Sequence, residues 1–311
     1  MTSRFAAKLR ALAEAEFGTA NPAAIDKWLR YWSSTVERNQ ALLQFFRSKL
    51  NVGLKGKRVL DVGCGTAGLS QLVTSGGGTY FGCDFFEGIL TIGQAFTRDL
   101  RLASQASLVR GSAIELPFAN DSIDIAIGFD VIEHLIGGET WQLRFLSEIR
   151  RVLRPDGLLL LTTPNKLCPF EGHTFLIGPQ FLPVPLADVY IRWLRPEFFR
   201  EYRSYAEVRL LMPGRMKALL AKAGLSPLHQ LPWCTDSDSY RPGARLFLRA
   251  CKAAGLGWAV FYKFQIAAAR TEAAKALMTI KRPVRDEAFF PEPGFGGLLK
   301  KGMTLIKRGG A

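Results

Sequence analysis

A short, acidic and glycine-rich turn limits the folds open to this chain more than any other feature. The turn runs from Asp61 to Gly68, directly after a strand-like stretch at 58–62 and before a helical stretch that contains Leu69 and Leu72. Glycines let the backbone approach a ligand that a Cβ atom would hold away. A strand, such a turn and a helix in this order predict an open α/β sheet with a ligand pocket at the turn.

The rest of the chain repeats this alternation of strands and helices. Short apolar runs rich in β-branched residues predict buried strands at 58–62, 79–83, 107–110, 123–128 and 158–162. Helical stretches separate them, which indicates a parallel sheet covered by helices on both faces. A sixth strand is expected near 228–233, and 303–307 is the late stretch that could supply a seventh.

We therefore expect an α/β protein with a doubly wound, seven-stranded sheet and several additions. The predicted parts are an N-terminal helical lid at 1–56, the core at 57–239 with a proline-rich and aromatic cap at 164–205, a basic helical insertion at 240–296, and the last strand and tail at 297–311. Within the lid, 24–50 has helical periodicity. Its aromatic residues Trp28, Tyr31 and Trp32 line an acceptor pocket or belong to the core.

Charge is distributed unevenly along the chain. Of the net charge of +14, residues 1–58 contribute +7, residues 59–240 contribute −3 and residues 241–311 contribute +10. Basic flanks favour a polyanionic partner, although a solvated basic face that binds nothing has the same signature. The five cysteines form no Cys-x-x-Cys pair, so neither a disulfide framework nor a thiolate zinc site is indicated, and a reducing cytoplasm fits best.

Two carboxylates bear on the choice of cofactor. The turn formally satisfies the G-x-G-x-x-G pattern, so a nicotinamide-dependent dehydrogenase is one alternative. Asp61 argues against it, because a carboxylate there would repel a pyrophosphate, whereas it can receive the ammonium group of S-adenosylmethionine (SAM). Asp84, at the end of the second strand, can accept hydrogen bonds from both ribose hydroxyls of either cofactor.

Four successive motifs resemble those of class I SAM-dependent methyltransferases. They are Val59-Leu-Asp-Val-Gly-Cys-Gly-Thr66, Gly111-Ser-Ala-Ile-Glu-Leu-Pro-Phe118, Ile123-Asp-Ile-Ala-Ile-Gly-Phe-Asp-Val-Ile-Glu-His134 and Glu148-Ile-Arg-Arg-Val-Leu-Arg-Pro-Asp-Gly157. Together they cover about residues 57–165. Within the family, the motifs resemble those of ubiquinone-biosynthesis O-methyltransferases and of bacterial enzymes that act on sugars or lipids.

The resemblance implies a SAM site, with S-adenosylhomocysteine as product. The implied contacts are Asp61, Gly63, Cys64 and Gly65 at the methionine end, Asp84 at the ribose, Phe85, Ser112 and Ala113 at the adenine, and Phe129 under the sulfonium. Two positions depart from the family pattern. Ala67 stands where a third glycine is usual, and Ser112 stands where an aspartate is usual. These departures suggest weaker cofactor binding or some loss of activity.

Two histidines are candidate catalytic bases, because imidazole titrates near neutral pH. His134 follows the fourth strand, and His173 lies in the loop after the fifth, where open α/β sheets place their sites. The simpler alternatives are a histidine bonded to backbone for His134 and a cap histidine bonded to Glu171 for His173. The string from Asp130 to His134 also resembles the magnesium ligands of quinone O-methyltransferases, but we expect a site without metal.

The acceptor is the least determined feature. The resemblance implies methyl transfer to an oxygen of a small or lipid-linked amphipathic molecule. The alternatives are an N- or C-methyltransferase, the dehydrogenase, and a SAM-fold protein that binds without catalysis. The oligomeric state stays open, and nucleic acid is a weaker candidate partner because the sequence contains no recognised binding module.

The basic insertion suggests peripheral contact with the inner face of an anionic membrane. Arg245, Arg249 and Lys252 fall on one helical face, and an aromatic and apolar stripe follows at Trp258, Phe261, Tyr262 and Ile266. Cations beside exposed aromatic rings suit a helix that lies in a membrane interface. The alternative is that the stripe packs on the sheet while the cations face water.

Overall fold

The computed structural model describes residues 50–200, 202–233 and 263–272, together with 7, 9–11, 13–15, 26, 29, 36–37, 39–44 and 47. The fold described below is that of these residues.

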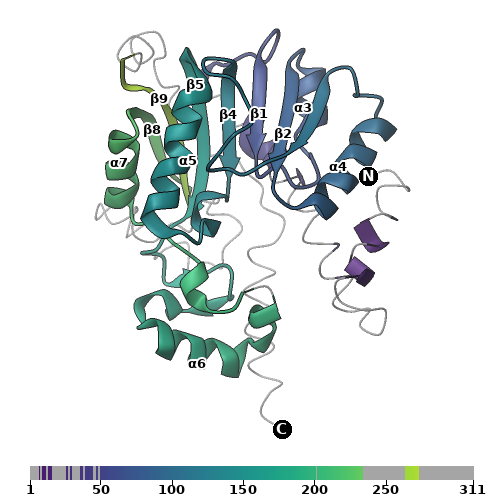
Figure 1. Cartoon of the computed structure of the whole chain (residues 1–311). Coiled ribbons are helices and arrows are strands. Elements are labelled where there is room, and N and C mark those ends of the chain that lie inside the picture. The colour runs from purple at the N-terminus through teal and green to yellow at the C-terminus, as the bar shows by residue number, and fades with distance from the viewer. Residues whose placement is uncertain are drawn as a thin grey trace, which may run out of the picture.

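A seven-stranded sheet forms the centre of the molecule, with strand order β3-β2-β1-β4-β5-β9-β8 (Figure 1). The strands are β1 (Arg58–Val62), β2 (Thr79–Asp84), β3 (Ala106–Arg110), β4 (Ile123–Phe129), β5 (Leu153–Pro164), β8 (Leu225–Trp233) and β9 (Lys263–Arg270). The neighbours from β3 to β5 pair in parallel, and β9 is antiparallel to both β5 and β8. The predicted doubly wound α/β sheet is confirmed.

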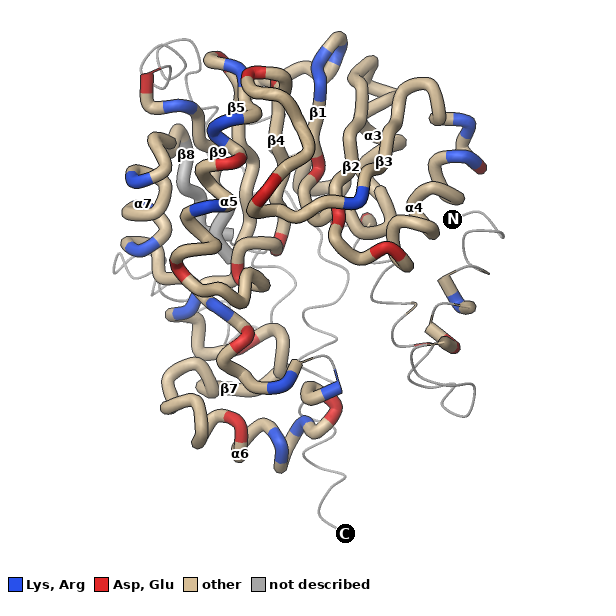
Figure 2. The backbone as a smooth tube through the Cα atoms, viewed as in Figure 1, with Lys and Arg blue, Asp and Glu red and all other residues tan. Residues whose placement is uncertain are grey.

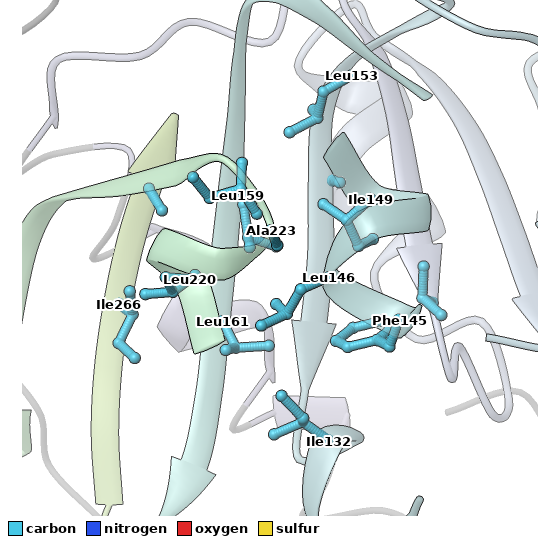
Figure 3. Close-up of a cluster of buried hydrophobic side chains, with 14 of the residues drawn as sticks. Ile132, Phe145, Leu146, Ile149, Leu153, Leu159, Leu161, Leu220, Ala223 and Ile266 are labelled. Carbon is cyan, nitrogen blue, oxygen red and sulfur yellow. The ribbon is translucent and has the colours of Figure 1, made fainter. Parts of the chain in front are cut away.

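Side chains alternate between the two faces of the sheet, and each face has its own core. On one face, Leu60, Leu159 and Leu161 pack with α5 (Gly138–Val152) and α7 (Pro213–Lys222), as Figure 3 shows for the leucines of β5. On the other, Val59 and Leu160 belong to the cluster that includes residues of α3 (Ser70–Ser75) and α4 (Glu87–Asp99). Burial on both faces explains why the strands have continuous apolar sequences.

The last strand of the sheet differs from the expectation. Residues 263–270 form β9 between β5 and β8, so the prediction of helix throughout 240–296 is wrong for this segment. Ala267, Ala268 and Ala269 favour helix locally, but all three are buried in the sheet, where tertiary pairing outweighs helix propensity. Ile266, the last residue of the predicted stripe, is also buried there, as the alternative of a stripe packed on the sheet expects. The proposed seventh strand at 303–307 lies outside the described residues.

The predicted cap follows β5 and therefore lies at the carboxyl ends of the parallel strands. It contains the short hairpin of β6 (Phe170–Glu171) and β7 (Leu176–Ile177), the helix α6 (Val184–Leu194), and three single-turn helices, η2 (Pro179–Phe181), η3 (Pro196–Arg200) and η4 (Tyr205–Glu207). Figure 1 shows α6 at one end of the molecule, away from the sheet.

Several predicted features fall outside the described residues. They are Trp28, Tyr31, Trp32, Arg245, Arg249, Lys252, Trp258, Phe261 and Tyr262. Within the predicted lid, residues 39–44 are helical, and Leu42 and Leu43 pack into the core on the α3 and α4 side. None of the helices in the described part of the chain is long and apolar enough to cross a membrane.

Candidate functional site

The glycine-rich turn after β1 has the backbone shape that its sequence predicts. Gly63, Gly65 and Ala67 have φ values of +69°, +51° and +57°, a region that residues other than glycine seldom adopt. A Cβ atom at Gly63 would lie 2.6 Å from Cγ2 of Val131. Gly63 is therefore required both by its backbone conformation and by close packing. Ala67 adopts the same conformation with a methyl group, so this departure from the family pattern leaves the turn intact.

Asp84 connects the end of β2 to this turn. Its carboxylate accepts a hydrogen bond from the backbone N–H of Gly65 (2.9 Å, to Oδ2) and another from that of Phe86 (3.0 Å, to Oδ1). The backbone N–H groups of Gly63 and Cys64 both donate to the carbonyl of Cys83. The turn and the candidate ribose ligand thus form one hydrogen-bonded unit at the carboxyl ends of β1 and β2.

Asp61, at the end of β1, is buried and bonded to a residue that the sequence analysis did not select. The hydroxyl of Tyr80 donates to Oδ2 of Asp61 at 2.7 Å, and both side chains are enclosed. Burial raises the pKa of Asp61 to about 7; the Tyr80 hydrogen bond opposes this rise, and the nearby charge of Asp84 adds to it. A cationic partner such as an ammonium group would stabilise the ionised form of this carboxylate.

The remaining candidate cofactor residues also lie at the carboxyl ends of the parallel strands. Phe85, directly after β2, is 77% exposed, so its ring is open to a stacking partner. Ser112 and Ala113 follow β3, where the Ser112 hydroxyl accepts from the N–H of Ile114 at 3.4 Å and Ala113 packs on the core. Phe129, at the end of β4, is buried. Because β3, β2, β1 and β4 are neighbours, the topology gathers all these positions at one edge.

The segment after β4 is fixed to β5 by two side-chain hydrogen bonds. Asp130, with φ of +57°, accepts from the hydroxyl of Thr162 at 2.9 Å. Glu133 is buried and accepts from the hydroxyl of Thr163 at 3.1 Å. These contacts hold the single-turn helix η1 (Ile132–His134), which presents His134 on the surface beside the cap.

The cap brings the second histidine to the first. The ring centroids of His134 and His173 are 5.1 Å apart, and the ring of Tyr202 stacks on His134 at 6.3 Å. Nδ1 of His173 lies 2.7 Å from Oε1 of Glu171. The carboxylate of Glu171 also accepts from the backbone N–H groups of His173 and Thr174, at 3.0 and 2.8 Å. The bond to Glu171, the simpler alternative for His173, is therefore present.

The environment of Glu171 keeps it ionised although its side chain is fully enclosed. Burial alone would raise its pKa, but the hydrogen bond and charge of His173 and the two backbone N–H donors outweigh burial, so the pKa is lowered. An ionised carboxylate at Nδ1 fixes the orientation of the imidazole and stabilises its protonated form. The same contact is expected for a histidine that holds the cap together and for a base with a positioning partner.

Three side chains in the described part of the chain could hold a metal ion together. One candidate ligand atom from each of Glu133, His134 and His173 lies within 4.8 Å of the others. Magnesium prefers an octahedral set of oxygens, whereas this group offers two imidazoles and a single carboxylate. Asp130, which the sequence analysis aligned with a magnesium ligand, is bonded to Thr162 and is not part of the group. The residues do not fit magnesium.

Comparison with known proteins identifies the family. A methyltransferase domain model matches residues 60–161, from β1 to β5. A demethylmenaquinone methyltransferase of Bacillus velezensis is 31% identical over 180 residues, which cover 55% of this chain and 72% of the relative. The chain belongs to the SAM-dependent methyltransferases. SAM is thus the cofactor expected at the turn after β1.

Other relatives of this methyltransferase cover less of the chain or are more distant. A probable SAM-dependent methyltransferase of Mycolicibacterium smegmatis is 34% identical over 125 residues, 40% of this chain and 44% of the relative. The chain thus spans less than half the length of that protein. A ubiquinone biosynthesis O-methyltransferase of Agrobacterium fabrum is 26% identical over 194 residues, 62% of this chain and 69% of the relative.

A solved structure supports the fold. The geranyl diphosphate methyltransferase structure in complex with SAM superimposes with a TM-score of 0.50 and 16% identity, over 84% of this chain and 94% of that one. At this identity the likeness concerns the fold alone.

Sequence reasoning missed two aromatic residues of the site. Tyr80 lies in a strand buried on both faces, and a buried phenol needs a hydrogen-bond partner, which is the signal that could have found it. Tyr202 had no such signal, because only the folding of the cap brings it to His134 and His173, at ring distances of 6.3 and 6.4 Å.

Proposed function

We propose that this methyltransferase transfers the methyl group of SAM to an oxygen of a small or lipid-linked amphipathic acceptor, with His173 as the catalytic base. The observation that carries this proposal is the meeting of His173 and His134, from the segments after β5 and β4, with ring centroids 5.1 Å apart, while Glu171 orients His173 at 2.7 Å. The name of the Agrobacterium relative, an O-methyltransferase, supports oxygen as the acceptor atom.

The proposed reaction needs a base because an oxygen acceptor has a proton to lose. With Nδ1 donating to Glu171, the basic nitrogen of the neutral imidazole is Nε2. The acceptor oxygen forms the new bond to the methyl carbon while the bond from carbon to sulfur breaks, which leaves S-adenosylhomocysteine. The acceptor proton passes to Nε2, and Glu171 balances the charge of the imidazolium that forms.

The cofactor part of the proposal assigns roles to residues at the edge of the sheet. Asp61 receives the methionine ammonium, Asp84 the ribose hydroxyls and Phe85 the adenine face, with Ser112 and Ala113 at the adenine edge. The turn of Gly63, Cys64 and Gly65 approaches the methionine end, and Phe129 underlies the sulfonium. Calorimetry with SAM, S-adenosylhomocysteine and NAD tests this pocket. Binding of the first two without NAD is expected, and preference for NAD would contradict it.

The catalytic assignment is tested by transfer of a labelled methyl group to a panel of phenols, long-chain alcohols, amines and carbon acids. Changing His173→Ala should lower turnover of an oxygen acceptor by about 10² or more while SAM affinity stays constant, within the usual range for a positioned base. Ile177→Ala is the matched control, because it removes an exposed side chain of the same hairpin and keeps the histidine. Equal loss of SAM binding and turnover in His173→Ala would indicate a structural role.

A further inference from the structure

The cap exposes a continuous apolar surface at the end of the molecule. The residues from Phe181 to Leu186 are all apolar and all exposed. On α6 the surface continues through Val189 and Trp193, which are 68% and 81% exposed. We define the apolar face of the cap as Phe181, Leu182, Val184, Leu186, Val189 and Trp193. Leu186, Val189 and Trp193 are spaced by three and four residues, so they share one side of the helix.

The opposite side of α6 is packed against the rest of the cap. This packing fixes the orientation of the helix and leaves its apolar side exposed. Ala187 and Ile191 are fully buried, in a small core that the cap forms with residues such as Phe198. Asp188 fixes the same side, because it accepts from the hydroxyl of Ser204 and from the backbone N–H of Tyr205, both at 2.7 Å. The helix therefore cannot rotate its apolar side inward without breaking these contacts.

Charge is arranged around this face and is absent within it. No Asp, Glu, Lys or Arg occurs from Gly172 to Ala187. Figure 2 shows the cations of the cap at the C-terminal part of α6 and in the turns that follow it. Arg192, Arg200 and Arg203 are exposed, and Arg192 lies 4.2 Å above the centroid of the Phe199 ring. Glu197, which is exposed, pairs with Arg195 at 3.5 Å, and the sequence places three more carboxylates in this part, at Asp188, Glu201 and Glu207.

We propose that the apolar face of the cap docks on an anionic phospholipid surface, with α6 parallel to the membrane plane. Exposed Leu, Val and Trp side chains suit the boundary between headgroups and acyl chains, and Trp prefers that depth. The exposed arginines at the rim attract anionic headgroups.

This surface is distinct from the one that the sequence suggested at 245–266. There Ile266 is buried in the sheet, as the alternative of a stripe packed on the sheet expects, and the other residues of that surface lie outside the described ones. His173 lies beside Tyr202, which stacks on Phe198 in the small core under α6, so docking would bring the site toward the bilayer. Only this last consequence, access of a lipid-linked acceptor from the membrane, rests on the proposed function.

Vesicle flotation of the full chain tests the proposal without measuring methyl transfer. We expect the protein to float with vesicles of equal parts phosphatidylglycerol and phosphatidylcholine, and much less with phosphatidylcholine alone. The double variant Val189→Ser and Trp193→Ser should lower the partition coefficient about tenfold or more, because it removes large apolar side chains from the interface. Trp141→Ser, on α5 outside the cap, should bind like the parent.

The charged rim is tested separately. Arg192→Gln with Arg200→Gln should weaken binding at low salt and have little effect at high salt, where screening already weakens the attraction. Arg98→Gln with Arg154→Gln removes the same charge elsewhere and should change binding less. SAM calorimetry and circular dichroism verify that each variant is folded, so loss of lipid binding by misfolding is distinguished from loss of the surface.

Several outcomes would overturn the proposal. They are failure of the parent to float at low salt, unchanged flotation of the Val189 and Trp193 double variant, and loss of flotation only when Arg245, Arg249 and Lys252 are changed to Gln. Light scattering that shows a dimer in the parent and a monomer in the double variant would assign the face to a second copy. As a further measurement, lipids with brominated acyl chains should quench a fluorescence component that is missing in Trp193→Phe.

Discussion

The hydroxyl of Tyr80 donates to the buried carboxylate of Asp61 at 2.7 Å, which joins the second strand of the sheet to the methionine end of the candidate SAM pocket. This contact lies beneath the glycine-rich turn and is invisible in the motif itself. It makes the ionisation of Asp61 depend on a residue outside the turn.

Tyr80→Phe should destabilise the free protein more at pH 8 than at pH 5. The hydrogen bond lowers the pKa of Asp61 from what burial alone would give, so its loss is most costly when the carboxylate is ionised. We expect a loss of about 1.5 to 3 kcal/mol at pH 8, as for a hydrogen bond to a charged group. Urea denaturation at the two pH values measures this difference. Equal losses at both would mean that Asp61 is not ionised at pH 8.

Asp61→Asn should remove part of the pH dependence of the free energy of unfolding. The pKa of Asp61 is raised from 3.8 to about 7, so its contribution to stability is fully present below about pH 4 and is lost as pH rises through about 7. The amide does not titrate, so this decline should vanish, while SAM affinity falls because the partner of the ammonium has lost its charge. Denaturation between pH 4 and 8 and calorimetry with SAM measure the two effects. Unchanged SAM affinity would contradict the ammonium assignment.

Asp84→Ala should weaken SAM binding by roughly 2 to 3 kcal/mol, given about 1.5 kcal/mol or more for each hydrogen bond to a charged acceptor. The carboxylate also accepts from Gly65 and Phe86, so part of the loss reflects a looser turn. Glu87→Ala is the control, because Glu87 is exposed and pairs with exposed Arg110. A folded Asp84→Ala variant that binds SAM as tightly as the parent would refute the assignment.

Gly63→Ala should destabilise the fold by about 2 to 4 kcal/mol, from steric overlap of roughly 1 to 3 kcal/mol and the left-handed backbone cost of about 1 kcal/mol. The overlap is with Val131, 2.6 Å from the added Cβ atom, so Val131→Ala should restore part of the loss. Gly138 has φ of +64° and no atom within 4 Å of the position that a Cβ atom would take, so Gly138→Ala should show the backbone cost alone. A double-mutant cycle without coupling between positions 63 and 131 would disprove the steric argument.

Glu171→Gln should shift the pH dependence of turnover and leave SAM affinity unchanged. Without the carboxylate the imidazolium of His173 loses its counter-charge, so the acidic limb of the profile should move to lower pH and turnover should fall. Glu171 has a lowered pKa, so its contribution to stability is present above about 4.5 and is lost as pH falls below it. Reduced stability with an unchanged pH profile would assign Glu171 to the cap alone.

The sequence by itself determined the core fold and the cofactor edge. Short apolar runs located β1, β2, β3 and β4 nearly to the residue, and the signal is clearest for β1 and β4, which are buried on both faces. The glycines and acidic residues of the turn could be recognised from the local sequence, because a positive φ and a carboxylate at a strand end depend on residues close together in the chain. The parallel order of the strands then brings these positions together at the carboxyl-terminal end of the sheet.

Tertiary structure decided what local sequence could not. The alanines of β9 favour helix, and only pairing with β5 and β8 makes them a strand. Tyr80 meets Asp61, and Tyr202 meets His134, across large separations in sequence. Burial sets the pKa of Asp61, and the packing of Ala187 and Ile191 turns the apolar face of the cap outward. Each of these depends on contacts between distant segments, whose energies are absent from any short window of the chain.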